Sequence, residues 1–336
     1  MDSLTHIAVG ACLGEAIAGK QLGRKAMLWG ALAHSLPDID FIAGFWMDTA
    51  EEMLAHRGFT HSFFFVFLFS PLLALVAQKL PGPQLSFKRW TALWAVGMLL
   101  HLALDVCNNY GTGLLEPFSH QRFSLHLLYV ADPLFSLAPF IAALLLLRRS
   151  VPAVRRRLWA TAFACSAVYL GLAAYSKQQV ASTVRSSLQR QGISQQRMFI
   201  SPSPLNTLLW YAVAGNDSGY HVAFHSVLDA DSSSIAWQYF PANRHWLDSM
   251  ADHEDLQHLI RFSQGFYTVE KWNDSLVFND LRFGQMLGWH QPRGRFVFHY
   301  YLQHPTENEV IVQRGRFKGW NKEVVLALLR RMAGQR

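Results

Sequence analysis

Residues 62–78 read SFFFVFLFSPLLALVAQ, a run that contains no Asp, Glu, Lys or Arg. Its length is close to the roughly 17–25 residues that an α-helix needs to cross a bilayer. Comparable uncharged runs occupy residues 90–104, 134–147 and 158–176. These four runs predict a helical membrane domain in the first half of the chain.

Two further segments near the N-terminus extend this domain. Residues 26–47 are apolar apart from two aspartates, and residues 4–19 are rich in Ala and Gly and interrupted by Glu15. We therefore expect six membrane helices, all within residues 1–176. The alternative is that these segments form the buried helical bundle of a soluble protein.

The composition agrees with a chain of two unlike parts. Hydrophobic residues make up 51% of the 336 residues and charged residues 16%, against roughly 25% charged in a typical soluble domain. Mean hydropathy is only +0.11, because no long apolar segment follows the first part. A purely soluble enzyme and a disordered protein are therefore not expected. All three cysteines lie in the apolar part, which leaves no disulfide framework for the remainder.

The net charge of +7 is best explained by membrane topology. No dense Lys/Arg block is interleaved with aromatic residues, so no nucleic-acid partner is expected. The first, third and fifth connections between the apolar segments are rich in Lys and Arg, whereas the second and fourth are not. By the positive-inside rule, the basic connections are cytoplasmic. The sequence predicts a multi-pass protein of the bacterial inner membrane whose C-terminal part is periplasmic.

The polar part predicts a small α+β domain over residues 205–336, after a linker at residues 177–204. The turn sequence Asn-Asp-Ser-Gly at residues 216–219 lies between two apolar runs, which predicts a β-hairpin. Asn321 is a candidate cap for a final helix. The function of this domain stays open at the level of the sequence.

Ionisable side chains collect at one depth of the predicted membrane domain. Under the topology above, they all lie towards the outer face, although the topology was derived from Lys and Arg alone. Ionisable groups in membrane segments are costly and are functional candidates by default. The candidate metal ligands are His6, Asp38, Asp40, His56, His61, His101 and Asp105.

The spacing of these residues favours metal binding. His101 and Asp105 lie one helical turn apart on one helix face. Asp38 and Asp40 follow Pro37, where a helix break could turn both carboxylates inward. Imidazole and carboxylate ligands without thiolate fit zinc or another first-row divalent metal. A proton or ion relay is the competing interpretation, but it would spread its carboxylates through the membrane.

Several other ionisable residues leave the completion of the site open. A single membrane histidine such as His34 is more often a packing or hydrogen-bonding residue than a ligand. The residues left open are Asp2, His34, His120, His126 and Asp132.

Four short motifs combine into a pattern that other proteins share. The motifs are MDSLTH at residues 1–6, LPDID at 36–40, HRGFTHS at 56–62 and HLALD at 101–105, with DPLF at 132–135 as a weaker match. Together they resemble the YdjM-like membrane-bound metal-dependent hydrolases. Their order is also distantly similar to that in zinc-dependent phospholipase C and related single-strand nucleases, which are all-helical. The chain has no HxxxE motif after its HxxxD motif.

The resemblance implies a phospholipase C-like helical core that holds one to three divalent ions, with zinc the expected metal. It implies a hydrolase that activates a water molecule with its metal and cleaves a phosphoester of a lipid or lipid-linked substrate. Asp38 or Asp40 would orient or deprotonate the water. Arg57 would contact an anionic group, or alternatively lie at the surface or against lipid headgroups. A metal- or proton-coupled transporter and a non-catalytic, metal-stabilised sensor remain the alternatives.

Overall fold

The computed structural model describes residues 1–336 except 83, 231–234, 304–318 and 336. The chain divides into two compact units, which we describe separately. The first comprises Met1–Phe45 and Ala55–Ala173, and the second comprises Trp46–Leu54 and Ala174–Arg336.

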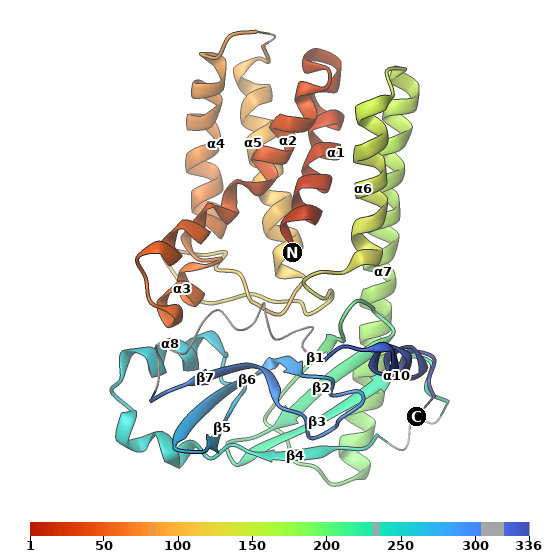
Figure 1. The fold of residues 1–336 in the computed structure, drawn as a ribbon. Coiled ribbons are helices and arrows are strands. Elements are labelled where there is room, and N and C mark those ends of the chain that lie inside the picture. Colours follow the sequence, from red (N-terminus) through yellow and green to blue (C-terminus); the bar gives the residue numbers. More distant parts are fainter. Residues whose placement is uncertain (83, 231–234, 304–318, 336) are drawn as a thin grey trace. The chain divides into compact units, whose positions relative to one another are not determined.

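The first unit is helical, and each of the six apolar segments of the sequence overlaps an α-helix. Helix α1 packs against α2, α5 and α6, while α5 also packs against α2 and α4 (Figure 1). A core of apolar side chains that includes Val66, Leu93 and Met98 holds α4 and α5 together. The helices are α1 (Ser3–Leu22), α2 (Lys25–Ser35), α4 (Phe63–Gln78), α5 (Phe87–Val106), α6 (Pro133–Arg148) and α7 (Pro152–Arg190).

One described helix, α7, is both long and apolar enough to cross a membrane. A second candidate span is the pair Thr49–His61 and Phe63–Gln78, which is bent by 57°. Helix α6 is apolar but shorter. The predicted number of six membrane crossings thus remains a prediction.

The segment predicted as one helix over residues 26–47 is broken. Helix α2 ends at Ser35, and Leu36–Phe45 continues as the 3₁₀ segment η1. Pro37 explains the change, because proline lacks the N–H that an α-helix needs and disfavours the α conformation of the preceding residue. The chain then passes through α3 (Thr49–Ala55) and the short 3₁₀ turn η2 (Phe59–His61) to α4.

Glycines bring α1 and α2 into backbone contact. A Cβ atom added to Gly30 would lie 2.2 Å from the carbonyl oxygen of Gly10 and 2.4 Å from the Cα of Gly14. A Cβ added to Gly10 would lie 2.6 Å from the Cβ of His34. Only glycine at these positions permits so close an approach, as in small-residue contacts between membrane helices.

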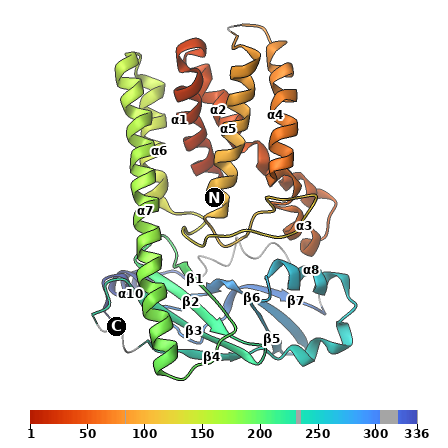
Figure 2. The same ribbon diagram turned by 180° about the vertical axis from the view of Figure 1, so that it is seen from behind.

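The second unit is built on two antiparallel sheets, as the view from behind also shows (Figure 2). One sheet has the order β1-β2-β3-β4 and the other β5-β6-β7. The strands are β1 (Arg197–Pro202), β2 (Leu209–Gly215), β3 (Gly219–Ser226), β4 (Gln238–Pro241), β5 (Tyr267–Trp272), β6 (Ser275–Gln285) and β7 (Phe296–Tyr301).

Alternate residues of β2 face different layers, as the strand period of two requires. Trp210 and Ala212 join the cluster formed with Val184 and Leu188 of α7. Val213 instead joins the cluster that contains residues of β6 and β7. The first sheet therefore buries both faces, one under a helix and the other against the second sheet.

The predicted α+β domain is present, and its hairpin is confirmed. Strands β2 and β3 pair on either side of the predicted turn, with Gly215 opposite Tyr220. Asn321 caps α10 (Lys322–Met332) by accepting a hydrogen bond from the Val324 N–H. The described part of this unit also contains η3 (Arg244–Met250) and α8 (Glu254–Phe262). In the predicted linker at residues 177–204, α7 continues to Arg190 and β1 follows.

Candidate metal centre

Helix ends and the two 3₁₀ segments of the first unit bring six ionisable side chains together. His6 lies in the first turns of α1, His34 in the last turn of α2, and His101 and Asp105 in the last turns of α5. Segment η1 supplies Asp38 and η2 supplies His61. Two groups of mutually close ligand atoms result, His6–His34–His101 and Asp38–His61–His101–Asp105. His101 belongs to both groups.

Backbone carbonyls fix the orientation of two of the histidine rings. The Nδ1 of His101 lies 2.6 Å from the carbonyl oxygen of His34, and the Nδ1 of His34 lies 2.8 Å from that of Gly97. A carbonyl only accepts, so each Nδ1 carries a proton, and the tautomer that leaves a lone pair for a metal has it on Nε2. Metal-ligating histidines are held in this way by their second ring nitrogen.

His61 is oriented by a carboxylate instead. Its Nδ1 lies 3.2 Å from Oδ2 of Asp40, and because a carboxylate only accepts, Nδ1 is the donor in this contact. Its Nε2 then faces the Nε2 of His101 at 3.0 Å and Oδ2 of Asp105 at 3.3 Å. Two lone pairs directed at one another repel, unless a cation or a proton lies between them.

The donor set and its burial fit a divalent metal. All the histidines of the two groups and Asp105 are fully buried. Among the described residues, Nδ1 of His6 and Nε2 of His34 are buried without a hydrogen-bond partner. Buried polar atoms normally have partners, so these two nitrogens are free to bind an ion or a water molecule. Imidazole nitrogen with carboxylate oxygen suits zinc and similar ions.

Asp38 is the accessible member of the cluster. Its Oδ1 lies 3.5 Å from Nε2 of His101 and 3.6 Å from Nε2 of His61. Its side chain is 26% exposed, whereas those of His61, His101 and Asp105 are not exposed at all. An external molecule would therefore reach the cluster on the Asp38 side.

Asp40 and His56, two of the predicted ligands, form an adjoining pair outside both groups. Oδ1 of Asp40 is 3.0 Å from Nδ1 of His56, and Oδ2 accepts from the backbone N–H of Arg57 at 2.8 Å. Thr60 donates to the same oxygen at 3.2 Å. With these partners, Asp40 holds the 56–61 loop and the ring of His61 in place. The ligand role predicted for both residues stays a prediction.

Arg57 lies inside the protein, and its backbone has a φ of 62°. Its Nε is 3.0 Å from Oδ2 of Asp105, and its Nη1 donates to Oδ1 of Asn108 at 2.6 Å. The guanidinium carbon stands 4.7 Å above the ring of Tyr110. Only 2% of the residue is exposed. In this structure Arg57 positions Asp105, which also pairs with the Met1 amino group.

The residues left open by the sequence separate into two kinds. His34, which we expected to be a packing residue, belongs to the cluster; its spacing of four residues from Asp38 is the only signal in the sequence. Asp2 and Asp132 cap α1 and α6, and Asp132 also accepts a hydrogen bond from Tyr169 at 2.9 Å. His120 pairs with Glu116, and His126 lies 2.8 Å from Oδ1 of Asn109.

Comparisons with known proteins agree with the motifs. The model of the family described as YdjM inner membrane protein matches residues 1–180. The inner membrane protein YbcI of Escherichia coli (strain K12) is 30% identical over 122 residues, which are 36% of this chain and 69% of YbcI. YfhP of Bacillus subtilis (strain 168) is 31% identical over 143 residues, 40% of this chain. That match spans only 42% of the length of YfhP. No solved structure matches the chain.

Proposed function

Since the chain belongs to the YdjM inner membrane protein family, we propose that it is an inner-membrane, metal-dependent hydrolase. Its substrate in this proposal is a phosphoester of a lipid or lipid-linked molecule. The Nε2 atoms of His61 and His101, 3.0 Å apart and flanked by two carboxylates, are the observation that carries the proposal. The carbonyl of His34 holds Nδ1 of His101, and Asp40 holds Nδ1 of His61, so both rings are oriented without a bound ligand.

Asp38, His61, His101 and Asp105 would hold the ion, and His6 and His34 would complete the site. A bound divalent metal would supply Lewis acidity and activate water at neutral pH. Asp38 is the side chain that we assign to orient the attacking water, because it is the exposed member of the cluster. Arg57 acts in the proposal by positioning Asp105; contact with an anionic substrate group remains a prediction for it.

The proposal includes the predicted topology of six membrane segments and a periplasmic C-terminal domain. The basic connections between α1 and α2, α4 and α5, and α6 and α7 support it through the positive-inside rule. The cluster lies where α1 begins and α5 ends, and in the proposed topology this end of the helices would be at the depth of the lipid headgroups. Fusions of alkaline phosphatase and of a fluorescent protein after Arg336 test the orientation. Activity of the phosphatase fusion alone agrees with it, and fluorescence alone overturns it.

Metal content and turnover of the purified full-length protein test the activity. We expect bound zinc or another divalent metal by elemental analysis, together with release of product from phospholipid vesicles. His101→Ala and Asp105→Ala should each lose both metal and turnover. His120→Ala is the matched control, because His120 is exposed and outside the cluster.

Two outcomes would overturn the hydrolase. Metal-bound protein that moves ions across vesicle membranes without turning over any lipid would indicate a transporter. Bound metal with neither flux nor turnover would indicate a metal-stabilised sensor. If His120→Ala lost metal to the same degree as His101→Ala, the cluster would not be the metal-binding site.

A further inference from the structure

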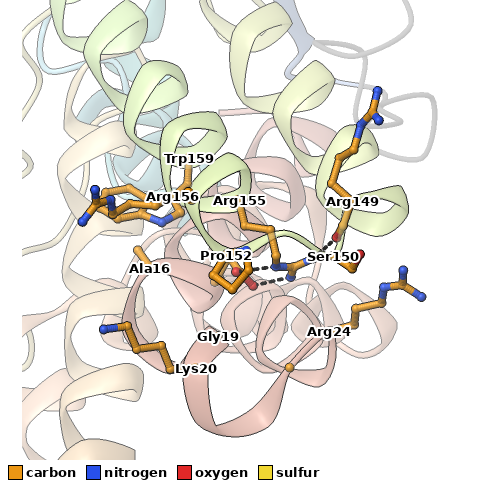
Figure 3. A pocket seen from close by; sticks show the side chains of 13 residues that line it. Ala16, Gly19, Lys20, Arg24, Arg149, Ser150, Pro152, Arg155, Arg156 and Trp159 are labelled. Atoms are coloured by element: carbon orange, nitrogen blue, oxygen red, sulfur yellow. Dashed lines mark hydrogen bonds and ion pairs between the residues drawn. The ribbon is translucent and has the colours of Figure 1, made fainter.

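A second site lies in the first unit, where the α1–α2 turn faces the connection from α6 to α7. It is a pocket of about 770 Å³ whose lining includes Lys20, Arg24, Arg149, Arg156 and Trp159 (Figure 3). His6 and the pocket residue Gly19 belong to opposite ends of α1. The pocket is therefore separate from the candidate metal centre.

The pocket carries an excess of positive charge. Five of its lining side chains are basic, and the one acidic side chain, Glu15, is paired with Arg155. Within the described part of the chain, Lys20, Arg24, Arg149 and Arg156 form no ion pair with an acidic residue. All four are exposed. Four uncompensated cations around one hollow favour an anionic ligand.

The pair between Arg155 and Glu15 makes one wall of the pocket rigid. Arg155 donates from Nε to Oε1 of Glu15 at 2.7 Å and from Nη2 to Oε2 at 2.5 Å. Its Nη1 also donates to the carbonyl oxygens of Leu146 and Arg149 at 2.6 and 2.7 Å. The backbone that carries Arg149 is thus tied to α1. Figure 3 shows Arg155 between the end of α1 and the connection from α6 to α7, with the other basic side chains around it.

Gly19 leaves room for this pair. A Cβ atom at this position would lie 2.6 Å from the carboxyl carbon of Glu15. The carboxylate of Glu15 therefore occupies the space next to Gly19 that a side chain would fill. Arg155 donates to it there from Nε and Nη2. Bidentate pairing of this kind is stronger and more directional than a single contact.

We propose that this pocket binds the phosphate group of an anionic phospholipid headgroup. Arginine and lysine match phosphate oxygens in charge and hydrogen-bonding geometry, and basic pockets between membrane helices bind such headgroups. The same chemistry would admit free phosphate. The neighbouring exposed side chains of Leu147, Val151 and Val154 favour the lipid, because they offer apolar surface to acyl chains beside the headgroup.

Half-buried Trp159 in the lining supports the same assignment. Tryptophan is enriched at the level of the headgroups, where its ring is partly apolar and its N–H remains able to donate. The assignment of a lipid source rests on the proposed membrane location, but not on hydrolysis at the metal centre. Lipid binding and hydrolysis can therefore fail independently.

Native mass spectrometry of the full-length protein in detergent, titrated with phosphatidylglycerol or phosphatidylcholine, tests the proposal. The variant combines Lys20→Gln, Arg24→Gln, Arg149→Gln and Arg156→Gln. The variant is compared per charge removed with the control Arg148→Gln plus Arg157→Gln, which removes two charges from exposed residues that do not line the pocket. We expect preferential binding of phosphatidylglycerol that weakens at least tenfold in the variant and less than twofold in the control.

Competition with inorganic phosphate distinguishes the two sources. Bound phosphatidylglycerol that resists millimolar phosphate supports the lipid. If phosphate at that concentration displaces the phosphatidylglycerol, the ligand of the pocket is a free anion, and the lipid assignment is overturned. Equal binding of the two lipids, or an equal loss of affinity per charge removed in the variant and the control, would show that the pocket is not an anion-binding site. Metal content measured on the same samples should be unchanged, which separates this result from a failure of the metal centre.

Discussion

His34 holds His101 through its backbone while its own ring faces the same cluster. The carbonyl oxygen of His34 lies 2.6 Å from Nδ1 of His101, and the two rings meet edge to face with their centroids 5.5 Å apart. The backbone contact sets the tautomer of His101, and it does not depend on the identity of the side chain at position 34. The two contributions of His34 can therefore be separated by mutation.

Replacing His34 with alanine should lower metal affinity without unfolding the centre. The carbonyl that orients His101 remains, whereas the unpartnered Nε2 of His34 is lost. We expect about a 10–100-fold loss of affinity, the range found when groups that support a metal site are removed. Competition with a fluorescent chelator measures it, with His120→Ala as control. Unchanged affinity would return His34 to the packing role that the sequence favoured.

Asp38 and Asp40 should respond differently to substitution by asparagine. Asp40 acts on Nδ1 of His61 from outside the cluster, so Asp40→Asn should weaken metal binding by about 10–100-fold and keep turnover at saturating metal. Asp38→Asn should lose turnover even at saturating metal, because Asp38 is the exposed carboxylate of the cluster. Titration of metal against turnover compares the two variants. Identical behaviour would contradict the assigned division of roles.

The sequence predicted the positions of the helices better than the roles of the ligands. The charge-free runs locate α4 to α6 within a few residues, because burial in lipid or protein leaves the same apolar signature. The pair His101 and Asp105 was predicted from helical spacing alone. The difference between Asp38 and Asp40 was not, since the fold of the 56–61 loop decides which ring nitrogen of His61 each carboxylate meets. The length of α7 was also missed, because its C-terminal part is apolar on only one face.

The close contact of α1 and α2 should be intolerant of a single methyl group. In Gly30→Ala, the new Cβ would meet backbone atoms of Gly10 and Gly14, which cannot rotate away. We expect a destabilisation of about 1–3 kcal/mol, the usual cost of overpacking. Gly171→Ala in α7 is the control, because no described atom lies within 4 Å of its added Cβ. Thermal unfolding in detergent should show a lower midpoint for Gly30→Ala only.

Asp229 should make the stability of the C-terminal domain depend on pH. Burial alone would raise the pKa of Asp229, but interactions with His225 at 2.9 Å and Arg331 at 3.0 Å outweigh it and hold the pKa below its usual range. A lowered carboxyl pKa contributes stability that is complete above the unfolded value of about 3.9 and is lost as the pH falls through the folded value. The stability advantage over Asp229→Asn should therefore be constant near neutral pH.

Thermal unfolding of the wild-type protein and Asp229→Asn across a pH series measures this advantage. At neutral pH we expect the variant to lose roughly 3 kcal/mol, as when one partner of a buried ion pair is removed. As the pH falls below about 4, the two midpoints should approach one another progressively, because the carboxyl of the unfolded chain takes up a proton before that of the folded protein does. A difference that stays the same in acid would show that the ion pair contributes no pH dependence. Arg330→Gln, at an exposed neighbour of Arg331, controls for general charge effects.

The glycine contact between α1 and α2 also bears on the entropy of ligand binding. His6 and His34 are carried by two helices whose backbones touch, with no side chain between them that could rearrange. Their relative position is fixed when the helices pack, so an ion that binds does not have to pay for ordering them. The selectivity of the centre then depends on how well an ion fits a fixed set of donors, and poorly matched ions cannot gain affinity by remodelling it.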